Sequence, residues 1–336
     1  MSEGAETSLT SFIDHHPSPE DFRGAVVHGL SLPQKALPSK FFYDEAGSAL
    51  FDEICQLEEY YPTRTEIGIL RAHVDEIAAL AGPRRQLVEF GSGSSVKSRI
   101  LLEALEDLAA YLPIDISREH LLRSATDLAA AFPNLKVIAV CADYTRAFDL
   151  PVPRHGSEVR QLGFFPGSSI GNLTPERATE FLANAANRLA GGSLLVGVDL
   201  KKDSRILDAA YNDSRGVTAA FNLNLLARIN RELAGGFDLN AFAHQAFYSD
   251  ALGRVEMHLS SMRPQSVRID GDAFDFGENE TIHTENSYKY TIDEFQSLAR
   301  RAGLSPKRVW SDPDWLFSIH YLEAASSAAR AFAGGR

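Results

Sequence analysis

Apolar and polar positions change their period along the chain, and this change separates two kinds of region. Between residues 21 and 80 the apolar positions recur at helical spacing, and Pro62 marks the restart of a helix. From residue 86 onward, short apolar runs of strand length alternate with helical stretches. The runs cover residues 87–90, 111–115, 135–141, 162–165 and 193–200. Such alternation predicts an α/β fold with a doubly wound, mostly parallel sheet.

The alternation stops after residue 200 and returns near Thr291. Residues 204–234 have helical spacing, whereas 254–261 and 265–270 alternate in the manner of two strands, which we expect to pair antiparallel with each other. Thr291 and Glu294 have the spacing of a capping box that opens a helix, and Gly303 is placed to end it. Two final strands are expected near 308–310 and 316–322.

We therefore interpret residues 201–289 as an insertion into a nucleotide-binding type of domain. Together with the N-terminal helices, the insertion is expected to form a second α+β domain that could act as a lid. The predicted boundaries are a flexible arm at 1–20, the second domain at 21–64 and 201–289, the sheet domain at 65–200 and 290–324, and a tail at 325–336.

Charge and hydropathy exclude several classes of partner. The formal net charge is −12, and the densest basic stretches are only pairs, such as Lys201-Lys202. An acidic chain without a basic stripe is not expected to bind nucleic acid. The apolar stretches are far shorter than a bilayer span, and the first residues lack the pattern of a secretory signal. We therefore expect a cytoplasmic monomer that does not contact membranes.

Metal binding is not expected either. Cys55 and Cys141 are the two cysteines of the chain, and no C-x-x-C spacing is present. His244 and His258 have no partners at a recognisable ligand spacing. We interpret both cysteines as buried thiols in a reducing compartment.

The first candidate for ligand chemistry is the turn after the strand at 87–90. Gly91 and Gly93 would let a ligand approach the backbone, next to the free N–H groups of the following helix. A dinucleotide-binding turn needs a third glycine where Val96 stands, so a dehydrogenase is disfavoured. The shorter form with a preceding acid, here Glu89, is typical of methyltransferases. The alternative is an ordinary strand–helix turn.

Two further acids follow the next strands. Asp115 lies 24 residues after Gly91 and could accept hydrogen bonds from two ribose hydroxyls. Its alternative role is that of a helix cap, for which Ser117 competes better. Asp143 and Tyr144 follow the third strand, where an acid and a ring could hold an adenine. The alternative for Asp143 is an ordinary turn acid.

The stretch at 167–175 follows the fourth strand and contains a candidate for orienting an amine. Thr174 can cap the next helix, and Pro175 fits its first turn. Asn172 would then lie at the carboxyl edge of the sheet, where ligands bind in open α/β folds. Its side-chain carbonyl could accept a hydrogen bond from an amine. The alternative is a turn-forming asparagine.

Longer stretches carry a resemblance to a known family. The chain resembles the histidine-specific α-N-methyltransferases of ergothioneine biosynthesis, from about residue 21 to residue 322. The similar stretches are 40–48 (KFFYDEAGS), 59–66 (EYYPTRTE), 167–175 (GSSIGNLTP), 216–222 (GVTAAFN), Glu256-Met257 and 284–287 (TENS).

This resemblance implies a Rossmann-like class I methyltransferase domain, a substrate-binding domain, S-adenosyl-L-methionine as the cofactor and L-histidine as the small-molecule substrate. It implies the trimethylated betaine hercynine as the product. The turn motif and the resemblance together suggest that the cofactor is contacted by Gly91, Gly93, Lys97, Asp115, Asp143 and Tyr144. The resemblance also implies that Asn172 and Tyr43 act in catalysis, and that histidine is surrounded by Tyr60, Gly167, Asn172, Tyr211, Met257, Glu285 and Ser287.

The residue types suit that substrate. The phenols of Tyr60 and Tyr211 can donate hydrogen bonds to a carboxylate. Glu285 and Ser287 are two apart on an expected strand, so both would face the same side and could hold the imidazole nitrogens. The alternative is a solvent-facing polar stripe on an edge strand.

Two other functions remain open at this point. The chain could methylate another amino acid, such as a tryptophan derivative, although Glu285 and Met257 favour imidazole over indole. It could also be a non-catalytic relative that only binds the cofactor. The presence of Asn172 together with Gly91 and Asp115 argues against this second alternative.

Overall fold

The computed structural model describes residues 10–15, 22–93, 96–146, 148, 150–151, 159–189 and 191–325. Most of the expected arm at 1–20, and all but the first residue of the expected tail at 325–336, lie outside these ranges. No helix of the described residues is long and apolar enough to cross a membrane.

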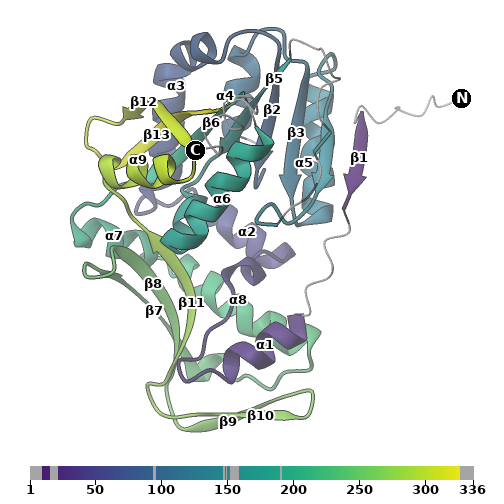
Figure 1. The fold of residues 1–336 in the computed structure, drawn as a ribbon. Coiled ribbons are helices and arrows are strands. Elements are labelled where there is room, and N and C mark those ends of the chain that lie inside the picture. Colours follow the sequence, from purple (N-terminus) through teal and green to yellow (C-terminus); the bar gives the residue numbers. More distant parts are fainter. Residues whose placement is uncertain are drawn as a thin grey trace, which may run out of the picture.

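An eight-stranded sheet forms the larger part of the molecule, with the strand order β1-β4-β3-β2-β5-β6-β13-β12 (Figure 1). The first six strands in this order pair parallel, which confirms the doubly wound, mostly parallel sheet. They are β1 (Ser11–Asp14), β4 (Ile138–Cys141), β3 (Ala110–Asp115), β2 (Arg85–Phe90), β5 (Arg160–Phe165) and β6 (Ser193–Asp199).

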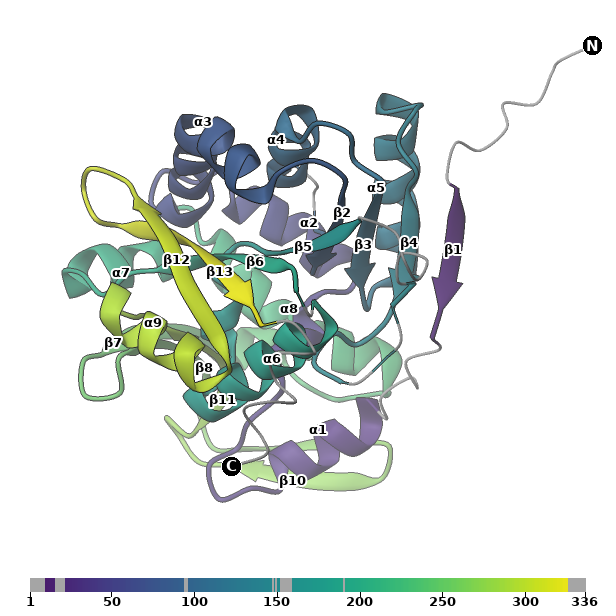
Figure 2. The same cartoon turned by 45° about the horizontal axis from the view of Figure 1, so that its top comes forward.

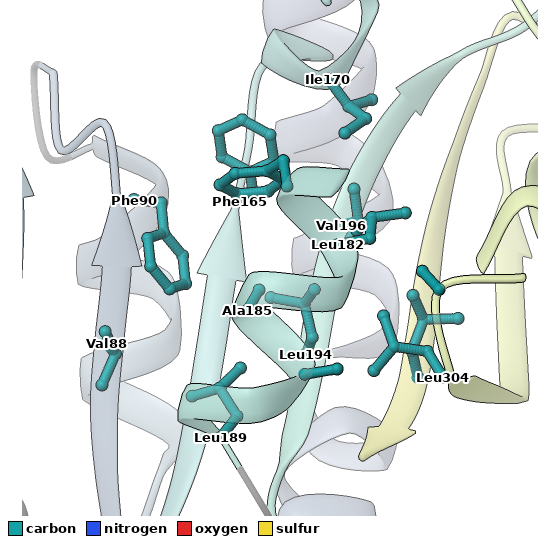
Figure 3. Packing of buried hydrophobic residues seen from close by; sticks show 14 of the residues in the cluster. Val88, Phe90, Phe165, Ile170, Leu182, Ala185, Leu189, Leu194, Val196 and Leu304 are labelled. Atoms are coloured by element: carbon teal, nitrogen blue, oxygen red, sulfur yellow. The ribbon is translucent and has the colours of Figure 1, made fainter. Parts of the chain in front are cut away.

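Alternating side chains of these strands supply both faces of the sheet. Leu87 and Tyr111 pack on the face covered by α3 (Tyr61–Ala81), α4 (Val96–Ala104) and α5 (Arg118–Ala131). Val88 and Phe90 point to the opposite face, where they join residues of α6 (Pro175–Arg188) and α9 (Ile292–Arg301), as Figure 3 shows for α6. Because β2 to β6 are buried on both faces, their apolar residues form nearly continuous runs, and these runs made the five strands visible in the sequence.

The last two strands are β12 (Leu304–Ser311) and β13 (Phe317–Ala324). β13 lies antiparallel between β6 and β12. The capping box of Thr291 and Glu294 is present at the start of α9, and Gly303 follows the helix with φ +79°. This end of the chain is as the sequence predicted.

The arm at 1–20 was predicted to be flexible, and this is wrong for the short strand β1. Ser11–Asp14 pairs parallel with β4 at the edge of the sheet, as Figure 2 shows. The ring of Phe12 packs on the face of α5, and Arg118 lies over that ring. A strand of four residues with one apolar pair is too short to give a period, so the sequence carried little signal for it.

A second packing unit lies at the carboxyl ends of the parallel strands (Figure 1). Its helices are α1 (Phe22–Leu30), the 3₁₀ turn η1 (Ser39–Phe42), α2 (Glu45–Ile54), α7 (Ser204–Tyr211) and α8 (Val217–Glu232). A three-stranded sheet has the order β11-β8-β7, and a two-stranded sheet has β10-β9. These strands are β7 (Phe242–Ser249), β8 (Arg254–Ser261), β9 (Gln265–Ile269), β10 (Asp272–Phe276) and β11 (Thr281–Tyr288), with η3 (Leu239–Ala241) before them.

The expected pairing of the strands at 254–261 and 265–270 is wrong. β8 is almost wholly buried and lies between β7 and β11, so both of its edges are already paired. β9 pairs with β10 instead, across a turn at Asp270-Gly271, where both residues have positive φ. An Asp-Gly pair between two short strands is a strong hairpin signal, and it identifies the correct partner.

The apolar residues of this unit form one core of their own, from Val26 to Tyr61 and from Leu207 to Ile282. This core is separate from the two that cover the sheet. The division of the chain into two domains remains a prediction, which this packing favours.

Candidate active site

A cavity of about 980 Å³ lies between the carboxyl edge of the parallel sheet and the second packing unit. It is lined by the ends of β2, β3 and β5, by α2 and by β11. Twelve of the fourteen residues predicted to bind cofactor or substrate line it: Tyr43, Tyr60, Gly91, Gly93, Lys97, Asp115, Tyr144, Gly167, Asn172, Tyr211, Glu285 and Ser287.

The glycine turn after β2 has the backbone that a closely bound ligand needs. Gly91 has φ +75° and Gly93 φ +42°, a region that favours glycine. A β-carbon on Gly91 would lie 3.6 Å from the ring of Tyr144, so this ring lies directly against the turn. The turn and the ring together form one wall of the cavity.

Two carboxylates lie near this turn, at the ends of β2 and β3. Glu89 is buried and accepts hydrogen bonds from Ser98 (2.6 Å) and from Tyr111, and burial raises its pKa to about 7. Asp115 accepts a hydrogen bond from the backbone N–H of Ser117 at 2.9 Å, and burial raises its pKa. Ser117 is the N-cap residue of α5, but its side chain makes no capping bond. Asp115 therefore orders the start of α5 while it faces the cavity.

Glu66 on α3 is a residue that the sequence analysis missed. Its fully buried carboxylate accepts hydrogen bonds from Lys97 and from the backbone N–H of Gly167, the latter at 2.9 Å. Gly167 has φ +75° and begins the loop that carries Asn172. One carboxylate thus connects a predicted cofactor residue with the loop on the substrate side.

The loop after β5 is held by its own helix cap. Thr174 accepts a hydrogen bond from the N–H of Arg177, and Pro175 occupies the first turn of α6, as the sequence predicted. Asn172 ends the 3₁₀ turn η2 (Ser169–Asn172) and lines the cavity. Its amide therefore lies at the carboxyl edge of the sheet, on a loop held at both ends.

Three aromatic side chains of the second packing unit form another wall of the cavity. The ring of Phe51 lies edge-on to Tyr43 (centroids 5.6 Å) and to Tyr60 (6.3 Å). Burial raises the pKa values of both phenols well above their ordinary range, so each remains a hydrogen-bond donor. Within the described ranges, neither phenol makes a hydrogen bond to another side chain, which leaves both hydroxyls available to a ligand.

β11 brings Glu285 and Ser287 to the cavity, although the strand is irregular. Its register with β8 shifts between His283 and Glu285, and Glu285 then pairs opposite Met257. Burial raises the pKa of Glu285 to about 7, and the positive charge of Lys289 limits the rise. Ser287 lies two residues further along, beside Tyr211.

A buried ionic cluster, also missed by the sequence analysis, lies under this strand. The carboxylate of Asp199, at the end of β6, is 2.7 Å from the ammonium of Lys289 and 2.6 Å from that of Lys202. Tyr61 donates a third hydrogen bond to it at 2.7 Å. Burial would raise the pKa of Asp199, but the two lysines outweigh this and lower it. The position of Asp199 at the carboxyl end of an apolar run was a usable signal.

Two predicted residues do not line the cavity. The carboxylate of Asp143 accepts hydrogen bonds from the backbone and hydroxyl of Thr145 and lies 3.6 Å from Arg146. Met257 is buried in the apolar core of the second unit, and it pairs opposite Glu285 on the neighbouring strand. Asp143 therefore has the geometry of a turn acid, and Met257 that of a residue supporting the strand.

The sequence shows no partners for His258 at a recognisable ligand spacing, but the fold places two such residues beside it. Ligand atoms of Glu256, His258 and His283 all lie within 4.8 Å of one another. The two imidazoles are stacked, with centroids 4.7 Å apart and planes 17° apart, so their nitrogen lone pairs lie in two nearly parallel planes and do not point to one common position. Arg254 also occupies one oxygen of Glu256. This arrangement is poorly suited to chelating one ion.

The cavity and the sheet define a class of protein. A Gly-x-Gly turn after β2, a carboxylate after β3 and an aromatic ring against the turn fit S-adenosylmethionine, and they lie where a doubly wound sheet binds nucleotides. The chain is an S-adenosylmethionine-dependent methyltransferase. It belongs to the family described as "Histidine-specific methyltransferase, SAM-dependent", which matches residues 22–324.

Individual relatives agree with this assignment. The chain is similar to a histidine N-alpha-methyltransferase of Mycolicibacterium smegmatis, with 42% identity over 93% of this chain and 98% of that protein. It is 29% identical to ergothioneine biosynthesis protein 1 of Schizosaccharomyces pombe, over 81% of this chain and 36% of that protein. An L-tryptophan methyltransferase of Psilocybe serbica is 26% identical over 90% of this chain and 92% of that protein.

Proposed function

We propose that this protein transfers methyl groups from S-adenosyl-L-methionine to the α-amino group of L-histidine, and that the product is the trimethylated betaine of ergothioneine biosynthesis. The observation that carries the proposal is the order of groups along one cavity. The glycine turn lies at one end and follows β2. Asn172 lies on the loop after β5, and Glu285 and Ser287 lie on β11 of the second unit.

The cofactor end is supported by Gly91, Asp115, Tyr144 and Lys97. S-adenosylmethionine supplies an electrophilic methyl group on a sulfonium. The carboxylate of Asp115 would accept hydrogen bonds from ribose hydroxyls, because it faces the cavity with acceptor capacity beyond its contact with Ser117. The ammonium of Lys97, held by Glu66, offers a positive charge to a carboxylate of the cofactor.

Asn172 and Tyr43 would orient the amine. An α-ammonium has no lone pair, and model α-amino groups titrate at about pH 7.7–8.0, so a neutral fraction is available near neutral pH. An amide oxygen on a fixed loop can accept an N–H bond and so direct the nitrogen lone pair. Positioning of this kind is worth up to roughly 7–11 kcal/mol. The mechanism therefore needs no strong general base.

Tyr60 is the better candidate for the substrate carboxylate. Tyr211 was expected to share this role, but its hydroxyl donates to Ser287 and accepts from Lys289. The trimethylated product carries a fixed positive charge, and the faces of Tyr43, Phe51 and Tyr60 provide the aromatic surroundings that such a cation favours.

We also propose that the protein acts as a cytoplasmic monomer on a small molecule and does not bind nucleic acid. The net charge of −12 and the lack of a basic stripe in the sequence support the last point. Light scattering of the purified protein at several concentrations tests the oligomeric state.

A turnover assay tests the activity. The protein is incubated with S-adenosylmethionine and each of the common amino acids, and S-adenosylhomocysteine and methylated products are measured by mass spectrometry. We expect histidine to be converted to its mono-, di- and trimethylated forms. Preferred conversion of tryptophan would support the alternative substrate, and no conversion of any amino acid would support a non-catalytic role.

The variant Asn172→Ala tests the proposed role of this residue in orienting the amine. It should reduce single-turnover rates at saturating histidine while S-adenosylhomocysteine still binds as in the unmodified protein, because the change removes orientation of the amine and no adenosine contact. Unchanged single-turnover rates would remove Asn172 from the proposed mechanism.

A further inference from the structure

Three polar side chains share one face of β11 and its continuation. Glu285, Ser287 and Lys289 follow one another at intervals of two residues, so they point to the same side of an extended chain, and all three line the cavity. Lys289 and Ser287 are buried. The role of this lysine follows from the hydrogen bonds it makes.

The ammonium of Lys289 has no free hydrogen. It carries three donors and no acceptor. Its nitrogen lies 2.7 Å from Asp199 Oδ2, 2.8 Å from Ser287 Oγ and 3.1 Å from the hydroxyl of Tyr211. The two hydroxyls must therefore act as acceptors toward Lys289, whatever the positions of their own hydrogens.

This contact decides what Ser287 can offer to a ligand. Ser287 Oγ also accepts the hydrogen of Tyr211 at 2.8 Å. A serine oxygen has two lone pairs, and both are now used. Its own hydrogen is left to donate elsewhere, and Ser287 lines the cavity. Ser287 thus presents a donor there and no acceptor.

Lys289 keeps its proton because of Asp199. Burial alone would lower the pKa of Lys289, but the carboxylate of Asp199 and the hydroxyl of Tyr211 raise it above its ordinary value. Lys202 binds the same carboxylate at its other oxygen, and its further hydrogen bonds among the described residues go to Tyr61 and Leu200, not to Ser287 or Tyr211. The donor character of Ser287 is therefore set by Lys289.

The two groups at the ring end have opposite polarity. An ionised Glu285 can only accept, whereas Ser287 can only donate. A neutral imidazole carries one N–H and one bare nitrogen. On a strand, the Cα atoms of residues i and i+2 are separated by about 6.6 Å. An imidazole bonded at both nitrogens needs partner atoms on the order of 7 Å apart.

We propose that Lys289 is a positioning residue that fixes Ser287 as a hydrogen-bond donor, so that the ring end of the cavity selects a neutral ring with one N–H and one bare nitrogen. The inference rests on the proposed histidine methylation and explains its selectivity. An indole or a pyrrole has no bare nitrogen and would leave the Ser287 hydroxyl unpaired, which is costly in a buried site.

Analogue binding tests the inference without relying on turnover. The dissociation constants of histidine and of the two pyrrolylalanine isomers, which keep one ring N–H and lack the bare nitrogen, are measured by calorimetry with saturating S-adenosylhomocysteine. For the unmodified protein we expect histidine to bind about 10- to 100-fold more tightly than the better isomer. Lys289→Met should reduce this ratio to within about 2-fold, since Ser287 can then donate its hydrogen to Tyr211, and a pyrrole ring bonded to Glu285 no longer leaves a buried donor unpaired.

Lys202→Met is the matched control. It removes the other cation from Asp199 but leaves the contacts of Lys289 with both hydroxyls, so the ratio should stay as in the unmodified protein. Because the test compares the ratio of two dissociation constants, a loss of affinity that is equal for both ligands does not change the result. A Lys289→Met ratio equal to that of the unmodified protein would overturn the inference.

A second variant guards against misfolding of Lys289→Met. Ser287→Ala removes the donor itself, so it should reduce the ratio to a similar degree, and a retained ratio in this variant would equally overturn the inference. Failure of the proposed function looks different: the unmodified protein would then neither bind nor methylate histidine, and both proposals would fall together.

Discussion

The backbone N–H of Gly167 donates to both carboxylate oxygens of Glu66, at 2.9 and 3.1 Å, while Lys97 binds one of the same oxygens. Glu66 is fully buried on α3, and a β-carbon on Gly197 would lie 2.0 Å from it, so the carboxylate is closely confined. A confined anion that joins Lys97 to the Gly167 loop relates the cofactor side of the cavity to the substrate side.

Glu66→Gln is expected to destabilise the protein and to weaken cofactor binding. The amide can still accept from Gly167, but the largely buried ammonium of Lys97 loses its counter-charge. Breaking a buried ion pair from one side costs about 3–5 kcal/mol, and partial exposure of Lys97 brings the expected loss to about 3 kcal/mol or less. Urea unfolding and calorimetry with S-adenosylhomocysteine measure the two effects.

Glu76→Gln on the same helix is the control for this prediction. Glu76 pairs with Arg308 at the surface, where ion pairs contribute little. Equal stability of the two variants would mean that Lys97 does not depend on Glu66 for its charge balance.

Asp115 and Asp143 were both predicted to bind the cofactor, and the structure distinguishes them. Asp115→Ala should weaken S-adenosylhomocysteine binding by at least about 10-fold, because hydrogen bonds to a charged group contribute roughly 1.5–3 kcal/mol each. Asp143→Ala should have a much smaller effect, because this carboxylate already bonds with Thr145 and does not itself line the cavity. Calorimetry on both variants checks the order, and a larger loss for Asp143→Ala would reverse our assignment.

The inner parallel strands of the sheet were predictable because they are buried on both faces. Runs such as 87–90 and 193–200 contain nearly continuous apolar residues, and the glycine turn and the capped loop at Asn172 directly follow two of the runs. Local sequence determines these features. Local sequence also determines the hairpin at Asp270-Gly271, because an Asp-Gly pair between two short strands indicates that these strands pair with each other.

Other features depend on contacts that no local pattern contains. Asp199 and Lys289 are 90 residues apart, and a bridge between Leu200 and Tyr290, which joins the segments after β6 and β11, brings them together. The stacked rings of His258 and His283 likewise come from two neighbouring strands with an irregular register. Period-two alternation could have placed Lys289 on the face of Glu285, but its buried partner could not be predicted in this way.

The stability of the ligand-free protein should depend on pH through Glu285. Burial raises its pKa from 4.5 to about 7. A carboxyl group with a raised folded pKa keeps the folded state more stable at low pH, and this advantage is lost as pH rises from the unfolded pKa to the folded one. The shift corresponds to roughly 3 kcal/mol. Glu285→Gln is therefore expected to be more stable than the unmodified protein at pH 8.5, by about 1–3 kcal/mol.

Urea unfolding at pH 8.5 and at pH 5 measures this difference, which should nearly vanish at the lower pH. Glu280→Gln gives the opposite sign, because the ion pair with Lys35 lowers the pKa of Glu280, and its removal should reduce stability at pH 8.5. A Glu285→Gln variant that is less stable than the unmodified protein at both pH values would contradict the assigned burial.

Selectivity for histidine is expected to depend on the carboxylate of Glu285, which faces the cavity beside Ser287. Glu285→Ala removes the acceptor for the imidazole N–H, a bond worth roughly 1.5–3 kcal/mol, so kcat/KM for histidine should fall by about one to two orders of magnitude. The same change enlarges the cavity and removes a desolvated charge that opposes an apolar ring, so kcat/KM for tryptophan should rise.

The two substrates together decide what Glu285 does. If kcat/KM falls for histidine and rises for tryptophan, Glu285 recognises the ring of the substrate. A parallel fall for both would mean that Glu285 supports β11 and its packing against Met257, and a thermal unfolding curve would then show a loss of stability. If neither value changes, Glu285 lies outside the functional part of the cavity, and the choice between histidine and another amino acid must rest on a different residue. Because tryptophan has no bare ring nitrogen, its rise should be larger still when Glu285→Ala is combined with Lys289→Met, which frees Ser287 to accept the indole N–H.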